Sequence, residues 1–277
     1  SILFLPLTLA AETAFSVSGG KENTDYSYTD NVYTVRTGTP LTFSGSTTTD
    51  RITIAEGVTA DITLNGVSID VSGIDNAGAI RLEKKAKLTL HLTGNESTLK
   101  SGIRAAGIGL SDGSDLHITA ESTSSKLSVV GGNDSNTWGS AGAGIGGNLS
   151  EEGKAAIRIL NGNISATGGT DSGYLGNSGD GIGQNGDRKL ELVIVIDGGE
   201  ITAKGGSAPN YGSAGYGICG DVIINDGTFT NCTLNDNIVI NNGTFNESTI
   251  NGTFTINGGT ITKKCKLICN PTGIING

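Results

Sequence analysis

The sequence predicts an all-β protein, a right-handed parallel β-helix built from coils of three short strands. The dipeptide Gly-Ile recurs at residues 107, 144, 181 and 217, with spacings of 37, 37 and 36. Short runs of alternating apolar residues lie between these dipeptides, and a turn motif near the C-terminus repeats every 16 residues, at 225, 241 and 257. Self-similarity at a fixed period is typical of stacked repeats. The handedness follows from the right-handed crossover preference of parallel strands.

Each long repeat contains the same elements in the same order. A strand begins at Gly-Ile, a second has the pattern Ile-x-Ile, an Asn-Gly or Asp-Gly turn follows, and a third strand ends at a Gly-Gly pair. A loop of about ten residues leads to the next Gly-Ile. Two earlier coils occupy residues 52–69 and 79–99. We expect the recurring apolar positions to stack in the core, namely Ile108, Ile145, Ile182 and Ile218, and in the 16-residue coils Phe229, Phe245 and Ile261.

The remaining segments are less periodic. Residues 1–12 are either the remnant of a signal peptide or a first strand, because they are apolar and end in small residues. Residues 13–47, rich in tyrosine, are expected to cap the first coil, and residues 48–277 to form the β-helix. The one place where the sequence allows a short helix is Ser150–Ala156, since residues 149–152 resemble a helix start.

Composition excludes several functions. The net charge is −9 and charged residues are only 16%, so the basic surface that nucleic acid requires is missing. The apolar run at the N-terminus is too short to span a bilayer, and nothing after residue 12 looks transmembrane. The Gly-x-Gly-x-x-Gly patterns at 142–147 and 215–220 follow the coil period and indicate repeat geometry rather than a dinucleotide site. The four cysteines form no C-x-x-C pair, which excludes a zinc ribbon; they are small apolar residues or disulfide partners.

A column of turn residues is expected to run along the helix. Because successive coils lie about 4.8 Å apart, equivalent amide side chains can hydrogen-bond from coil to coil. Asn also tolerates the left-handed conformation that turns require. We interpret this column as structural, and its predicted members are Asn161, Asp197, Asn225, Asn241 and Asn257.

Three aromatic residues suggest a ligand-binding surface. Trp138, Tyr174 and Tyr211 each fall between a Gly-Gly pair and the next Gly-Ile, so they should stack on one side of the helix. Aromatic residues are only 5% of the chain, which makes this placement notable. A row of rings beside Asn and Ser side chains suits a polysaccharide or surface glycan, because rings cover the apolar faces of pyranoses. The alternative is that the rings pack on one another and hold the loops down.

Two other groups could bind ligands. His91 and His117 are expected in equivalent strand positions, pointing outward near Arg158, on a solvated face or on a polar ligand-binding face. The Gly-Gly-x-Asp segments that end at Asp134 and Asp171 are similar to calcium-binding β-roll repeats, although the third copy lacks the carboxylate. A calcium ion near Asp134, Asp171 or Asp180 is one interpretation of these carboxylates. We identify no catalytic triad, paired catalytic carboxylates or metalloprotease motif.

The chain also resembles a known kind of domain. The segments Phe15–Tyr28, Val32–Val35, Pro40–Phe43 and Ile52–Asp70, together with the Ala-Gly-Ile-Gly repeats at 106 and 143, are similar to surface-protein domains of Gram-positive gut bacteria. These domains look like distant relatives of clostridial carbohydrate-binding β-helix proteins that hold polygalacturonate, within the pectate-lyase-like fold. The resemblance implies a secreted or cell-surface location, a larger surface protein around this chain, and a non-catalytic module that binds glycans or displays other domains.

The alternative function is a polysaccharide lyase or hydrolase of the same fold. Enzymes of that fold need clustered Asp residues, or an Arg or Lys base over a calcium site, and the sequence contains no such cluster. Their activity is therefore not carried over. Carboxylates at equivalent heights on one face of the helix would favour the enzymatic alternative.

Overall fold

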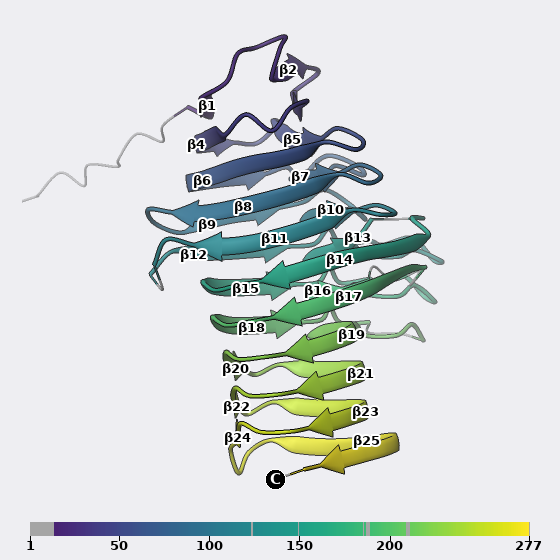
Figure 1. Ribbon diagram of the computed structural model, residues 1–277. Coiled ribbons are helices and arrows are strands. Elements are labelled where there is room, and N and C mark those ends of the chain that lie inside the picture. Colours follow the sequence, from purple (N-terminus) through teal and green to yellow (C-terminus); the bar gives the residue numbers. More distant parts are fainter. Residues whose placement is uncertain are drawn as a thin grey trace, which may run out of the picture.

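The structure is a computed structural model that describes residues 14–276 except 123, 149, 185, 187, 188, 209 and 210. The described part contains 25 strands and no helix. The strands form one long, mostly parallel sheet that is stacked level upon level (Figure 1). This solenoid-like, all-β arrangement is compatible with a parallel β-helix. The leader or strand expected at residues 1–12 lies outside the described residues.

Strands of successive levels lie side by side in three columns. The first column contains β3 (Val32–Val35), β5 (Arg51–Ile54), β7 (Ile80–Leu82), β10 (Ile108–Leu110), β13 (Ile145–Gly147) and β16 (Ile182–Gly183). The second contains β4 (Leu41–Thr47), β6 (Thr59–Asp70), β8 (Lys87–Thr93), β11 (Asp115–Ala120), β14 (Gly153–Ile159) and β17 (Leu190–Ile196). The third contains β9 (Ser97–Lys100), β12 (Lys126–Val130), β15 (Asn163–Thr167), β18 (Glu200–Lys204), β20 (Thr228–Thr230), β22 (Thr244–Asn246) and β24 (Thr260–Ile261).

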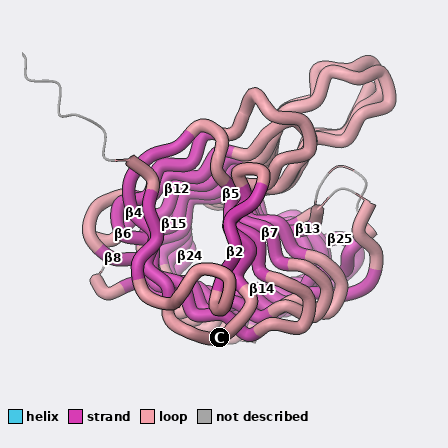
Figure 2. Tube along the Cα trace, turned by 90° about the horizontal axis from the view of Figure 1, so that it is seen from above, coloured by secondary structure: helices cyan, strands magenta, loops and turns pink. Residues whose placement is uncertain are grey.

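The C-terminal levels are simpler. Four long strands each run through both the first and the second column, so the loop that separates these columns in earlier levels is missing. These strands are β19 (Ile218–Ile224), β21 (Thr233–Ile240), β23 (Thr249–Ile256) and β25 (Lys266–Ile275). Seen along the stack, the columns surround a common axis and long loops leave one corner (Figure 2).

The N-terminal end is covered by two antiparallel strands. β1 (Ser16–Ser18) pairs with β4 and β2 (Tyr26–Thr29) pairs with β3, whereas the other strand pairs of the described chain are parallel. β3 and β4 already pair in parallel with β5 and β6. Aromatic rings fill the space under the cover, because such rings bury large apolar areas in edge and offset contacts. The contacting rings are those of Phe15, Tyr26, Tyr28, Tyr33 and Phe43.

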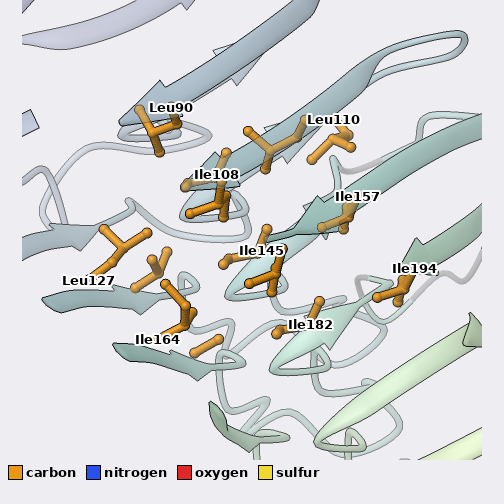
Figure 3. Packing of buried hydrophobic residues seen from close by; sticks show 14 of the residues in the cluster. Leu90, Ile108, Leu110, Leu127, Ile145, Ile157, Ile164, Ile182 and Ile194 are labelled. Atoms are coloured by element: carbon orange, nitrogen blue, oxygen red, sulfur yellow. The ribbon is translucent and has the colours of Figure 1, made fainter. Parts of the chain in front are cut away.

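The core is a set of apolar columns in register. Ile108 lies beside Ile145, and Ile145 beside Ile182 (Figure 3). Ile182 in turn lies beside Ile218, and all four are fully buried. The rings of Phe229 and Phe245 stack with centroids 4.8 Å apart and planes 8° from parallel. Ile261 continues that column but is only half-buried, so its expected burial is wrong. The reason is that β24 pairs with β22 on one side and with no described strand on the other.

Steric packing explains the recurring glycine before each core isoleucine. A Cβ on Gly107 would lie 2.3 Å from Val129 Cγ1 and 2.7 Å from the carbonyl oxygen of Gly144, so no larger residue fits there. The short helix that the sequence allowed near Ser150–Ala156 is replaced by the beginning of β14. Ala155 and Ile157 alternate into the core, as a strand period requires.

Candidate functional site

Three long loops lie against one another along the stack. They cover residues 131–144, 168–181 and 205–217, and each connects the third column of strands to the first. Isolated bridges join Asp134 to Asp171 and Ser140 to Asn177 in neighbouring loops. The backbone N–H of Tyr211 donates to the carbonyl oxygen of Tyr174 over 3.1 Å, which joins the second loop to the third. The loops therefore form one continuous surface.

The three predicted aromatic residues lie on this surface and are open to solvent. Trp138 is 79% exposed, Tyr174 56% and Tyr211 75%. The rings of Tyr174 and Tyr211 meet with centroids 5.0 Å apart at an angle of 59°. Trp138 also forms one wall of a cavity of about 390 Å³, together with Arg104, Asp134 and Ser140. The contact between the rings of Tyr174 and Tyr211 joins the second loop to the third, while most of all three side chains stays open to solvent.

Buried carboxylates hold the loops in place by accepting hydrogen bonds from backbone N–H groups. Asp134 accepts hydrogen bonds at Oδ1 from the backbone N–H and side chain of Asn136, over 3.0 and 2.7 Å, and at Oδ2 from the N–H of Ser140 over 3.0 Å. Asp171 accepts at Oδ1 from the N–H of Gly173 over 2.6 Å, and its buried Oδ2 has no donor among the described residues. Burial, and secondly the charge of Asp134, raises the pKa of Asp171.

The third carboxylate of the calcium hypothesis is held in the same way as the other two. Asp180 is also buried, and it accepts from the backbone N–H groups of Tyr216 over 2.7 Å and Gln184 over 2.9 Å. Each of the three carboxylates accepts hydrogen bonds from loop amides, and those of Asp134 and Asp171 also lie close to each other, since a Cβ on Gly139 would be 2.1 Å from Asp134 Oδ2 and 3.0 Å from Asp171 Oδ2. Within the described chain, no three His, Cys, Asp or Glu side chains come together as metal ligands.

The expected equivalence of the two histidines is wrong, because the register of β8 and β11 places them two residues apart along the strands. His117 is directly beside Arg158 in register, with its Nε2 3.3 Å from Asp115 Oδ1. His91 is instead beside Thr119, two residues further along the strand, and its Nε2 lies 3.2 Å from Asp61 Oδ1. The structure therefore brings His117 and Arg158 together and leaves His91 apart from them.

Four members of the predicted column form a hydrogen-bonded ladder. The side-chain amide of Asn225 donates to Asp197 Oδ1 over 2.8 Å, Asn241 donates to Asn225 over 2.9 Å, and Asn257 donates to Asn241 over 2.9 Å. Asn276 extends the ladder by one step, over 2.7 Å. The bonds of Asn241 and Asn257 each span 16 residues, that from Asn225 to Asp197 spans 28, and that from Asn276 to Asn257 spans 19.

Asn161 stays outside this ladder. Because Ile159 pairs with Ile196, Asn161 lies one residue beyond the level of Asp197. Its Oδ1 accepts from the backbone N–H of Ala120 over 2.6 Å. Arg158 pairs with Asp197 instead, and its Nε donates to Asp197 Oδ2 over 2.6 Å. This bond, together with the one from Asn225, lowers the pKa of Asp197.

The sequence reasoning missed a polar groove of about 700 Å³ on the C-terminal levels. It lies where β19, β21 and β23 bend between the first and second columns. Two further amide steps lie along it: Asn251 donates to Asn235 over 2.7 Å and Asn237 donates to Asp221 over 2.8 Å. Its lining includes three carboxylates, from Glu191, Asp221 and Asp236. The 16-residue spacing of Asn235 and Asn251 could have indicated that these two residues stack. Spacing does not predict the bend in the strands that makes the surface concave.

Asp236 is the most unusual residue of the groove. Its φ is +81°, and the residues in register above and below it, Gly220 and Gly252, are glycines with φ of +146° and +103°. A residue with a side chain in such a conformation costs about 1–3 kcal/mol. The Cys219 thiol donates to Asp236 Oδ2 over 3.1 Å, and the Asn235 amide donates to Oδ1 over 2.9 Å. Two partners thus fix its carboxylate at the centre of the groove.

No disulfide joins the four cysteines, all of which lie in the described part of the chain. Cys219 and Cys232 are buried, Cys265 is half-buried and Cys269 is exposed. Burial raises the pKa of the Cys232 thiol to about 11. Cys232 thus behaves as a small residue of the interior, whereas Cys219 also donates to the Asp236 carboxylate.

Comparison with protein-family models, curated proteins and solved structures finds no match. A search of the described residues for a helix that is both apolar enough and long enough to cross a membrane also finds none. Any assignment of function therefore depends on this chain's own residues.

Proposed function

We propose that this chain is a right-handed parallel β-helix, with coils of 36–37 and then 16 residues, that binds glycans without cleaving them. In this proposal it is a secreted or cell-surface module of a larger bacterial surface protein, related to the clostridial β-helix proteins that it resembles. The observation that supports glycan binding is the exposure of Trp138, Tyr174 and Tyr211 on consecutive stacked loops.

The chemistry of a sugar chain matches this surface. A pyranose has an apolar face that an aromatic ring can cover, and an edge of hydroxyl groups that amide and hydroxyl side chains can bond. Asn136 and Ser140 line the cavity beside Trp138 and supply such polar groups. The backbone bonds of Asp134 and Asp171 order the loops before a ligand arrives, so little entropy is lost on binding.

The test is a triple change of Trp138, Tyr174 and Tyr211 to Ala, followed by a glycan array and a melting curve on the same protein. Each ring is expected to contribute about 1 kcal/mol, so each single change weakens binding about fivefold and the triple change removes detectable binding. The melting temperature should stay the same, since the rings are exposed. The matched control changes all three residues to Phe, which keeps the rings and should retain most of the binding. A lower melting temperature with unchanged binding would show that the rings only hold the loops.

A second candidate function is hydrolysis or lyase cleavage of a polysaccharide in the C-terminal groove. The observation that favours it is the presence of Glu191, Asp221 and Asp236 in one groove, because glycoside hydrolysis uses a pair of carboxylates on either side of the scissile bond. A reducing-sugar assay on pectins and neutral polysaccharides tests it. Release of sugar by the native chain that disappears in Asp236→Asn would support cleavage, and no release would leave binding as the function.

A further inference from the structure

A second cavity lies next to the one beside Trp138. It has a volume of about 210 Å³ and is lined by Asn76, Arg81, Arg104, Ala105 and Asn148. Arg104 lines both cavities and therefore lies between them. A single water occupies about 30 Å³ of liquid volume, so the smaller cavity can hold a group of several heavy atoms.

The cavity contains hydrogen-bond donors without acceptors. Asn148 is only 6% exposed, and its Nδ2 has no acceptor among the described residues. The Nε of Arg104 is likewise buried without an acceptor there. Gly109 makes room for the Asn148 amide, because a Cβ on Gly109 would lie 1.9 Å from Asn148 Oδ1. The Nε of Arg81 is close to Glu83 Oε1, at 3.0 Å, but makes no hydrogen bond with a described residue either. Buried polar groups are nearly always paired, so three unpaired donors at one cavity indicate a missing acceptor.

The charges of the lining point to an anion. Arg81 is already balanced, with Nε 3.0 Å from Glu83 Oε1 and Nη2 3.4 Å from Glu151 Oε1. Arg104 makes no ion pair with any described residue, and it holds a left-handed backbone conformation with φ of +66°. The guanidinium of Arg104, which has no counterion among the described residues, and the unpaired side-chain N–H of Asn148 thus line the same cavity. Guanidinium groups match oxyanions well, because they donate several hydrogen bonds in one plane.

We propose that this cavity is an oxyanion site that holds a sulfate, phosphate or carboxylate group, with Arg104 as its charged partner and Asn148 as its second donor. Since Arg104 also lines the cavity beside Trp138, the oxyanion is a substituent of the sugar chain that lies against that ring. This extension to a sugar rests on the proposed function, whereas the oxyanion site itself does not.

The experiment follows the melting temperature of the full chain in inorganic sulfate or inorganic phosphate, with chloride at equal ionic strength as the reference. Sulfate and phosphate also stabilise proteins by exclusion from their surface, so a variant of the cavity is needed to separate specific binding from this general effect. Arg104→Gly is the variant of choice, because glycine accepts the left-handed conformation and the protein should fold at least as well. We expect a saturable rise in the native chain and an apparent Kd at least tenfold weaker in Arg104→Gly.

Lys85→Gly is the matched control. Lys85 has φ of +59°, so this change also relieves a left-handed residue and removes one positive charge, but outside the cavity. Its apparent Kd should stay within twofold of the native value. An equal anion response in the native chain and in Arg104→Gly would overturn the proposal. So would a native response that does not saturate.

A glycan array separates this proposal from the proposed function. Native protein should bind sulfated, phosphorylated or uronate glycans better than neutral ones, and Arg104→Gly should lose this preference while it keeps binding to neutral glycans. Unchanged preference in Arg104→Gly would refute the extension to a sugar and leave glycan binding intact. Anion binding without any glycan binding would refute the proposed function and support the oxyanion site alone.

Discussion

The side-chain amide of Asn241 donates to Asn225 Oδ1 over 2.9 Å, and Asn241 Oδ1 accepts from Asn257 over the same distance. Each Asn is thus both a donor to one level and an acceptor from the next. An amide has two N–H donors and an oxygen with two acceptor positions, so the ladder uses only part of its capacity. Because the Asn members of the ladder are exposed on the surface, each bond between them stabilises the fold modestly.

Replacement of Asn241 by Ala should lower the free energy of unfolding by about 1–2 kcal/mol, because two hydrogen bonds are lost at once. Unfolding in urea measures the change. Asn242→Ala is the control, since the amide of Asn242 lies 3.4 Å from its acceptor on Asp226 and should contribute less than about 0.5 kcal/mol. Equal losses in the two variants would show that the ladder has no special effect.

A charge in the core column should unfold the middle levels. Ile182 is fully buried between Ile145 and Ile218, and an unpaired buried carboxylate is severely destabilising. We expect Ile182→Asp to abolish the cooperative thermal transition seen by circular dichroism, and Ile182→Val to cost about 0.5–1.5 kcal/mol. Ile223→Asp is the control, because Ile223 is 37% exposed on β19, lies beside Val195 and Val239, and should tolerate the charge. A normal transition in Ile182→Asp would contradict the core assignment.

Sequence spacing alone predicted the burial of core residues that have an equivalent residue in the levels above and below. Ile145 has an equivalent residue above and below it, so periodicity determines its burial. Ile261 has a partner on one side only, and the turn at Asn161 is shifted by one residue because the pairing of Ile159 with Ile196 determines the register. Periodicity does not record either effect.

The candidate site was less predictable. Placement of Trp138 between loop signals indicated which side of the stack it occupies, but its exposure depends on what neighbouring loops cover. The groove around Asp236 comes from a bend in long strands, and the cavity beside Arg104 joins segments from separate coils. Neither the bend nor this proximity has a period that a single sequence can reveal.

The ion pair of Arg158 and Asp197 should make stability depend on pH at the acid end. Arg158 is the main cause of the lowered pKa of Asp197, so the folded chain releases this proton more easily than the unfolded chain. The stabilisation is therefore complete above the ordinary pKa of 3.8 and is lost as the pH falls through the lowered value. Arg158→Gln should reduce the melting temperature at pH 7, and the difference from native should shrink in acid.

Salt provides the second test of this pair. Half of the Arg158 side chain is exposed, so high salt should weaken the effect of the substitution at pH 7. Lys154→Gln is the control, because Lys154 and Glu191 are both mostly exposed and their pair should contribute less. The same loss of melting temperature at pH 7 and at low pH would refute the role of the Asp197 charge.

Asp171 should have the opposite pH dependence. Burial and the charge of Asp134 raise the pKa of Asp171, so the unfolded chain loses this proton first as the pH rises. Below its ordinary pKa of 3.8 the group is protonated in both states and imposes no penalty; the penalty grows as the pH rises through the raised value and then stays constant. Asp171→Asn should therefore raise the melting temperature at pH 7 and change it little at pH 3.

The same substitution bears on the aromatic surface, because Asp171 orders the loop that carries Tyr174. Asn keeps an oxygen for the N–H of Gly173 and removes a buried charge beside Asp134, so the loop should be held at least as well and glycan affinity at pH 7 should be equal or higher. Asp134→Asn is the control, with the opposite expected result. In one orientation the new amide N–H would face the N–H of Ser140, and in the other the bonds from Asn136 would be lost. This variant should therefore have a lower melting temperature at pH 7. Lower stability of Asp171→Asn at pH 7 would show that its carboxylate is needed in the charged form, and that the loop depends on a partner for Oδ2.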